Sequence, residues 1–276
     1  MKISISNIAW DPDEDEEVAE LLTSRLISSI DVAPGKYFPD PVSAKERDVL
    51  AVRAAWEKRG FAIEGMQALL FGTVGMNMFG PEDVRCRMLD HLLAVCRIGG
   101  WLGARRLVFG SPRNRDRSGL GDEAAMGMAR DFFRRLGDIA ANHGVVVCLE
   151  PNPPRYGANF MVDAASTAAV VREVAHPAIR MQFDLGAVVD NREDLLAIVR
   201  EYGGLTGHIH LSEPGLVPLG DAGTQHDLIA PVLRGGFPDR LACIEMVATT
   251  AEPHVQAIAR ALDVACRYYA GPDQAQ

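Results

Sequence analysis

Carboxylate and imidazole side chains follow apolar runs at four places in the second half of the sequence. The runs read CLEPN at 148–152, MQFDLG at 181–186, GHIHLSE at 207–213 and CIEM at 243–246. They deliver Glu150, Asp184, His210 and Glu245. Burying three unpaired carboxylates together would cost many kcal/mol, and a divalent cation removes that cost. Three carboxylates and one imidazole suit Mn²⁺, which we favour, or Mg²⁺, and would also accept Co²⁺ or Zn²⁺.

The third of these runs offers two histidines. Side chains alternate along a strand with period two, so His208 and His210 lie on the same side. We predict His210 as the metal ligand because it lies nearer the carboxyl end, with His208 deeper. A carboxylate at a strand end often caps a helix or forms a salt bridge instead, and a lone histidine is usually structural. The recurrence on four successive runs favours the metal site.

Short apolar or β-branched runs alternate with longer amphipathic stretches along the whole chain. We predict strands at 2–9, 30–33, 62–67, 106–110, 145–150, 179–184, 205–211 and 241–246. Helices are predicted at 14–27, 44–59, 82–102, 122–142, 164–175, 193–202, 227–233 and 253–269.

Eight strand–helix units in strict order predict an α/β fold, a single (β/α)8 TIM barrel. The main competitor is an open doubly wound sheet, but no glycine-rich phosphate loop follows the strand that contains Ile3–Ala9. No Pro/Gly/Ser-rich linker divides the chain, so we predict one barrel domain over 1–270 and a frayed tail over 271–276. In such a barrel the carboxyl ends of the strands meet at one mouth, which would gather the four polar groups.

The composition excludes several classes of function. Hydrophobic residues make up 48% of the 276 residues, as in a soluble globular protein. The formal net charge of −9 argues against nucleic acid as a partner. No apolar stretch is long enough for a membrane span, and the N-terminus turns polar too early for a signal peptide. Five dispersed cysteines without a CxxC pair indicate reduced thiols and a cytoplasmic protein.

Further polar residues fall near predicted strand ends. Asn7 and Trp10 close the first strand, and an aromatic ring there could pack on a sugar or simply fill the rim. Arg113, Arg115 and Arg117 follow the fourth strand and form either a solvated basic loop or a clamp for a phosphate or carboxylate. The predicted substrate-binding residues are Asn7, Trp10, Glu64, Gln67, Arg113, Arg115, His208 and Glu213.

Two loop regions of the predicted barrel also carry expectations. His226 and Asp227 are expected to cap the helix after the seventh loop. The apolar stretch Leu69–Phe79 is expected to be either a mobile lid or a contact surface, which allows a homo-oligomer. The expected partner is a small carbohydrate substrate that could be anionic.

The ordered motifs LEPN at 149–152, QFDLG at 182–186, GHIHLSE at 207–213 and IEM at 244–246 resemble those of a known superfamily. It is the xylose isomerase-like TIM-barrel superfamily, in its sugar isomerase/epimerase branch, which includes ketose 3-epimerases and hydroxypyruvate isomerase. GMQALLFG at 65–72 and FGSPRNR at 109–115 look like motifs of the same superfamily. The resemblance implies that Glu150, Asp184, His210 and Glu245 bind one divalent metal. It also implies that Glu150 and Glu245 are the catalytic acid/base groups.

The chain departs from that family at two positions. Members often carry a histidine three residues after the strand-six aspartate, where this sequence has Ala187. Ketose epimerases tend to have an arginine shortly after the strand-seven glutamate, but the stretch that follows Glu213 has none. These departures point to a non-standard substrate, such as a phosphorylated or amino-substituted one.

The resulting prediction is a metal-dependent isomerase or epimerase of a sugar or a sugar-derived substrate. It would abstract the proton α to a carbonyl and pass through an enediolate. One alternative is a dehydratase or lyase on the same scaffold, and another is a non-catalytic sugar-binding barrel. An endonuclease IV-like repair enzyme would need a three-zinc cluster with more histidines, and Gln67 and Ala187 stand where further ligands would be required.

Overall fold

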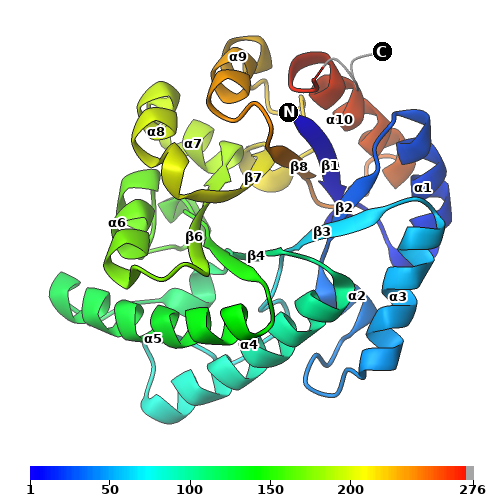
Figure 1. Ribbon diagram of the computed structural model, residues 1–276. Helices are drawn as coiled ribbons and strands as arrows, with labels where there is room; N and C mark the ends of the chain where they lie inside the picture. Colours follow the sequence, from blue (N-terminus) through cyan, green and yellow to red (C-terminus); the bar gives the residue numbers. More distant parts are fainter. Residues whose placement is uncertain (272–276) are drawn as a thin grey trace.

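The computed structural model describes residues 1–271 and contains a closed barrel of eight parallel strands (Figure 1). Each strand pairs with the next, and β8 pairs with β1. The strands are β1 (Lys2–Ser6), β2 (Ser29–Val32), β3 (Ala62–Met66), β4 (Arg106–Phe109), β5 (Val146–Leu149), β6 (Ile179–Asp184), β7 (Thr206–Ser212) and β8 (Leu241–Glu245). All eight predicted strands are confirmed, and so is the single (β/α)8 barrel.

Helices surround the barrel on all sides in Figure 1. They are α1 (Asp15–Ser24), α2 (Pro34–Tyr37), α3 (Glu46–Lys58), α4 (Glu82–Leu102), α5 (Asp122–Asn142), α6 (Ala164–Val174), α7 (Leu185–Asn191), α8 (Leu195–Tyr202), α9 (His226–Gly236) and α10 (His254–Tyr268). The eight predicted helices are all present, with ends shifted by a few residues. The short helices α2 and α7 were not predicted, because neither is long enough to show a clear helical period.

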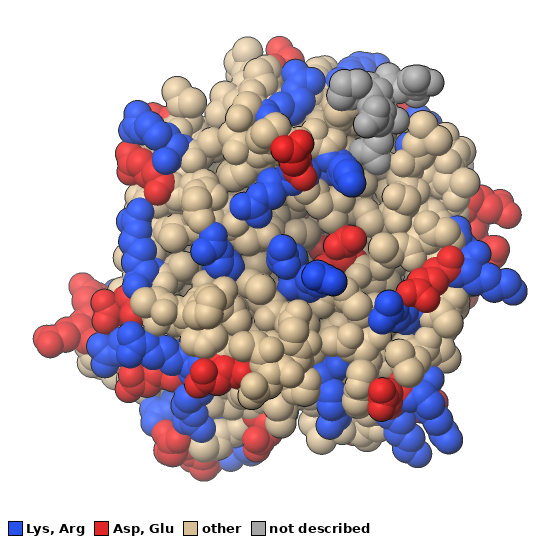
Figure 2. All heavy atoms as spheres, in the orientation of Figure 1, with Lys and Arg blue, Asp and Glu red and all other residues tan. Residues whose placement is uncertain are grey.

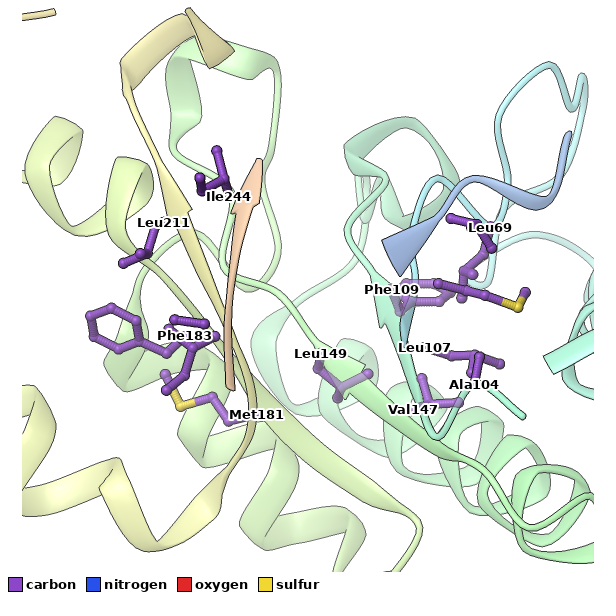
Figure 3. Packing of buried hydrophobic residues seen from close by; sticks show 14 of the residues in the cluster. Leu69, Ala104, Leu107, Phe109, Val147, Leu149, Met181, Phe183, Leu211 and Ile244 are labelled. Carbon is purple, nitrogen blue, oxygen red and sulfur yellow. The ribbon is translucent and has the colours of Figure 1, made fainter. Parts of the chain in front are cut away.

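One set of alternate strand residues is apolar and faces the surrounding helices. Leu107, Phe109, Val147 and Leu149 belong to this layer and to one continuous hydrophobic cluster (Figure 3). Burial of such side chains contributes about 25 cal/mol per Å² of apolar surface, so this layer supplies most of the stability of the barrel.

The other set of strand residues points into the barrel and contains many polar groups. Asp31 of β2 contacts His208 of β7, and Gln67, just after β3, contacts Glu245 of β8. Neither pair of strands is adjacent in the barrel, so both contacts cross the interior. Most TIM barrels fill this space with Val, Ile and Leu. The polar filling indicates that the interior serves a site as well as stability.

Gly271, the last residue that the structure describes, lies beside the N-terminus. The amide of Gly271 donates a hydrogen bond of 2.9 Å to the carbonyl of Met1. The rest of the predicted frayed tail, 272–276, lies outside the described residues. Within residues 1–271, no helix is both long and apolar enough to cross a membrane.

Candidate metal centre

Four polar side chains meet at the carboxyl ends of β5 to β8. Glu150 follows β5, Asp184 ends β6, His210 lies in β7 and Glu245 ends β8. All four are buried, and each offers one ligand atom within 4.8 Å of the others. The structure therefore brings together the four residues that the sequence indicated as metal ligands.

The donor atoms of this cluster are poorly satisfied by the protein. Nδ1 of His210 lies 3.3 Å from Oε1 of Glu150 and 3.1 Å from Oε2 of Glu245. Within the described residues, neither ring nitrogen of His210 nor Oε1 of Glu150 has a hydrogen-bond partner. Buried polar atoms without partners cost free energy, and three oxygen donors with one imidazole suit a divalent cation. The residues present thus fit one such ion.

The three carboxylates of this cluster carry negative charge that must be balanced by positive charge. Burial raises the pKa of Asp184, and the negative charges of Glu150 and Glu245 raise it further, well above its usual value. Burial alone would lower the pKa of His210, but the charges of Glu245 and Glu150 hold it well above the usual value. Burial would raise the pKa of Glu245, and the charge of His210 lowers it instead. The site is balanced either by protons or by a cation.

Neighbouring groups orient the two carboxylates of β6 and β8. Asp184 accepts 2.6 Å hydrogen bonds from the Ser212 hydroxyl and from the backbone amide of Ala187. It thereby also caps α7, and its place in the cluster leaves it a candidate metal ligand as well. Oε1 of Glu245 accepts a 2.7 Å hydrogen bond from Gln67, which leaves Oε2 facing His210.

Glu150 depends on the loops around it. Its Oε2 lies 3.3 Å from Nδ2 of Asn152, and a side chain at Gly110 would overlap the carboxylate. The guanidinium of Arg115 donates 2.7 Å to the Glu150 carbonyl and also bonds Oδ1 of Asn152. Burial lowers the pKa of Arg115 to about 10 although the charge of Glu150 opposes this. Arg115 is fully buried and supports the Glu150 backbone, so the prediction that it clamps a substrate anion is corrected.

The substrate-binding predictions for Trp10 and Glu64 are corrected by their positions. Trp10 is buried, donates from its indole to Asp15 and packs edge-on against Trp56, so its ring is not offered to a sugar. Glu64 is the extra residue of a β-bulge in β3 and lines a pocket at the opposite end of the barrel.

His208 is deeper than His210, as predicted, but it is engaged there. Its Nε2 lies 2.6 Å from Oδ2 of Asp31, and both residues are buried. The structure therefore places His208 below the mouth and not against a substrate.

Glu213 fixes the loop between β7 and α9 and is not free for a substrate. Its carboxylate accepts from the backbone amide of Gly220 and the Thr224 hydroxyl, and lies 2.9 Å from Nε2 of His226. His226 begins α9, but Gln225 occupies the cap position. The predicted capping by His226 is therefore wrong, because its ring bonds Glu213 and Tyr269.

The remaining predicted residues lie on the mouth side of the strands. Gln67 contacts Glu245, and Arg113 is exposed on the turn after β4. Oδ1 of Asn7 accepts from the amide of Ala33, so it ties the loop after β1 to the end of β2. In the predicted lid or contact surface at 69–79, Phe71 is 87% exposed and Val74 is 92% exposed. Both expectations for this segment stay open.

Sequence reasoning missed three residues that organise the centre: Asp31, Asn152 and Ser212. Asp31 is an acid inside the short, buried strand Ser29–Val32, a signal in the sequence that points to it. Asn152 lies inside the LEPN motif but was not assigned a role. The contact from Ser212 to Asp184 joins neighbouring strands, and it depends on a register that the sequence does not reveal.

A (β/α)8 barrel with a buried carboxylate–imidazole centre at the carboxyl ends of its strands defines the class of this protein. The family model for the xylose isomerase-like TIM barrel matches residues 27–267, and the chain belongs to that family. No sequence among curated proteins matches the chain.

Solved structures agree with the fold. A D-psicose 3-epimerase in the presence of D-fructose has a TM-score of 0.81 at 15% identity, over 98% of this chain and 100% of that one. A 3-keto-D-glucoside 4-epimerase from E. coli has a TM-score of 0.75 at 17% identity, over 95% and 98%. A probable 3-DHS dehydratase from Bacillus anthracis has a TM-score of 0.72 at 14% identity, over 96% and 98%. At these identities the likeness shows the fold alone.

Proposed function

We propose that this protein is a divalent-metal-dependent isomerase or epimerase of a sugar or sugar-derived substrate. The observation that carries the proposal is the placement of Glu150 and Glu245, whose carboxylates approach the same ring nitrogen of His210 from β5 and β8. The fold is shared with a D-psicose 3-epimerase and a 3-keto-D-glucoside 4-epimerase, which supports epimerisation as the type of reaction.

The residues that would hold the metal are Glu150, Asp184, His210 and Glu245. Mn²⁺ is the favoured ion for this set of three carboxylates and one imidazole. When bound, the ion supplies Lewis-acid polarisation of a substrate carbonyl, which acidifies the proton on the neighbouring carbon.

The two glutamates do the proton transfers. One of Glu150 and Glu245 removes the proton α to the carbonyl, which produces an enediolate, and the same or the other glutamate returns it. Return to the opposite face of the same carbon gives an epimer, and return to the neighbouring carbon gives the aldose–ketose isomer. Gln67 keeps Oε1 of Glu245 engaged, so Oε2, which faces His210, is the oxygen available to take up a proton.

The residues around the metal centre support a modified sugar as the substrate. Ala187 contributes only a buried methyl group beside Asp184. Arg113, exposed after β4, is the remaining candidate for an anionic substituent, and Asn7 remains a candidate for a hydroxyl group. A small carbohydrate substrate is consistent with these features.

The test is exchange of solvent deuterium into candidate ketoses, followed by NMR with Mn²⁺ present. The panel includes D-fructose, D-psicose and their phosphate esters. Glu150→Gln and Glu245→Gln should each lower the exchange rate by about a hundredfold or more. Glu201→Gln, half-exposed on α8, should exchange as the wild type does. A kcat near the wild-type value in either Glu150→Gln or Glu245→Gln would contradict the proposal.

A dehydratase is the second candidate, because the fold is also shared with a probable 3-DHS dehydratase. It begins with the same proton removal and ends with loss of water. Mass spectrometry of the product separates the two reactions, since only the dehydratase lowers the mass by one water. Tight sugar binding without any turnover would instead indicate a non-catalytic binding protein.

A further inference from the structure

A second polar site lies at the amino-terminal end of the barrel, opposite the metal centre. Arg106 begins β4, Arg180 is the second residue of β6 and Arg240 directly precedes β8. In Figure 1 the strands run clockwise from β1 to β8, so right-handed crossovers turn their amino-terminal ends to the viewer. Figure 2 shows basic side chains gathered near the middle of this face.

A pocket of about 200 Å³ opens between these strand starts. Its charged lining consists of Arg105, Arg106, Arg240, Glu64 and Asp239. His208, whose ring packs against that of His210, also lines the pocket. The pocket and the mouth are therefore separate sites at the two ends of one barrel.

Two arginines that line the pocket, Arg106 and Arg240, bond one backbone carbonyl, and Arg180 lies close to them. Nε of Arg106 and Nη1 of Arg240 donate to the same carbonyl, that of Gly207, at 3.0 and 3.4 Å. Arg180 bonds the nearby carbonyl of Gly204. A Cβ at Gly207 would lie 2.7 Å from Cβ of Arg180, so only glycine leaves room for this side chain.

These cations lack anionic partners. Among residues 1–271, Arg106, Arg180 and Arg240 form no ion pair with a carboxylate, and their side chains bond backbone carbonyls instead. The positive charges of neighbouring guanidinium groups repel one another. Burial lowers the pKa of Arg240, and the charges of Arg106 and Arg180 lower it further.

We propose that this pocket binds a small anion that carries a phosphate group. Each guanidinium has five N–H donors, and the backbone carbonyls use only some of them. The free donors match the oxygens of a phosphate, which arginine binds in bidentate fashion. Glu64 on the pocket wall can accept a hydrogen bond from a hydroxyl group of the ligand. The net charge of −9 disfavours a long polyanion such as nucleic acid.

The test is thermal unfolding of the full chain in inorganic phosphate, against sodium chloride of the same ionic strength. Wild-type Tm should rise with phosphate and saturate, because a ligand that binds only the folded state stabilises it. Arg106→Gln and Arg240→Gln should each weaken binding by roughly tenfold or more. Arg200→Gln, exposed on α8, should respond as the wild type does.

A purely structural role for the arginines predicts a different result. If they only clamp the carbonyls of Gly204 and Gly207, Arg240→Gln lowers Tm equally with and without phosphate. If they form an anion site, removal of one repelling charge leaves Tm without phosphate unchanged or higher. Broadening of the inorganic phosphate signal in ³¹P NMR gives a readout independent of stability. No saturating response in the wild type, or the same response in Arg240→Gln, overturns the proposal.

Discussion

Nε2 of His208 lies 2.6 Å from Oδ2 of Asp31, a contact that crosses the barrel between β7 and β2. The ring of His208 in turn packs edge-on beneath His210, with ring centroids 5.4 Å apart. His210, the candidate metal ligand of β7, therefore packs on His208, whose buried partner Asp31 lies on the other side of the barrel. This pair fixes both the local packing and the height of His210 in the mouth.

Loss of the Asp31 carboxylate should destabilise the barrel. Asp31→Asn removes a buried charge-assisted hydrogen bond, so the free energy of unfolding should fall by about 1–3 kcal/mol. Urea denaturation measures it. Asp48→Asn, exposed on α3, should stay within about 0.5 kcal/mol of the wild type. An Asp31→Asn protein as stable as the wild type would show that the contact contributes nothing.

Gly110 should be required for the metal centre more than for the fold. A methyl group there would overlap the carboxylate of Glu150, which is the end of a flexible side chain and can move away. Gly110→Ala should therefore keep its stability within about 1 kcal/mol and bind Mn²⁺ roughly tenfold or more weakly. Gly127→Ala on α5, where nothing lies within 4 Å of the new methyl group, is the matched control. Unchanged Mn²⁺ affinity in Gly110→Ala would contradict the assigned position of Glu150.

Gln67 should act as a positioning residue for Glu245. Gln67→Leu removes the 2.7 Å hydrogen bond to Oε1 and should lower kcat by about 10–100-fold with a smaller effect on KM. Gln67→Glu should be at least as damaging, because it adds a negative charge beside a carboxylate. Steady-state kinetics with the substrate found by deuterium exchange gives both constants. If both variants keep wild-type kcat, Gln67 does not orient Glu245.

The stability contributed by Glu213 should depend on pH. Burial would raise the pKa of Glu213, but the bonds from His226, Thr224 and the Gly220 amide hold it below its usual value. A carboxylate with a lowered folded-state pKa stabilises the protein above its unfolded-state pKa and loses that contribution as pH falls through the folded value. Glu213→Gln should therefore be less stable than the wild type at pH 7, and the difference should shrink below about pH 4. Urea denaturation at a series of pH values tests this, and a difference that grows toward acid would contradict it.

The fold and the four clustered residues could be predicted because they depend on local patterns. Apolar runs such as 145–150 mark strands buried on both faces, and alternation with helices restricts the topology to a barrel. Once the barrel is assumed, strand ends meet at one mouth. Glu150 and Glu245 therefore become neighbours although 95 positions separate them.

The supporting contacts could not be predicted because they depend on register and on loops that fold back. A bulge beside Ile63 turns Glu64 toward the other end of the barrel, and the sequence gives no sign of it. Arg115 is buried because its guanidinium donates hydrogen bonds to Asn152 and to the Glu150 carbonyl. These bonds join two loops. The position of Trp10 similarly depends on Asp15, which lies on the following helix.

The central claim is that the mouth of the barrel holds one divalent cation. Calorimetric titration of the metal-stripped protein with Mn²⁺ tests it, with Asp184→Ala, Asp184→Asn and the exposed-site control Asp138→Ala alongside. Asp184→Asn keeps an oxygen that can accept from the Ala187 amide, so it separates loss of a ligand from loss of the helix cap. We predict one Mn²⁺ per chain in the wild type and in Asp138→Ala, and none in either Asp184 variant. No binding in the wild type, or the same binding in both Asp184 variants, would contradict the account.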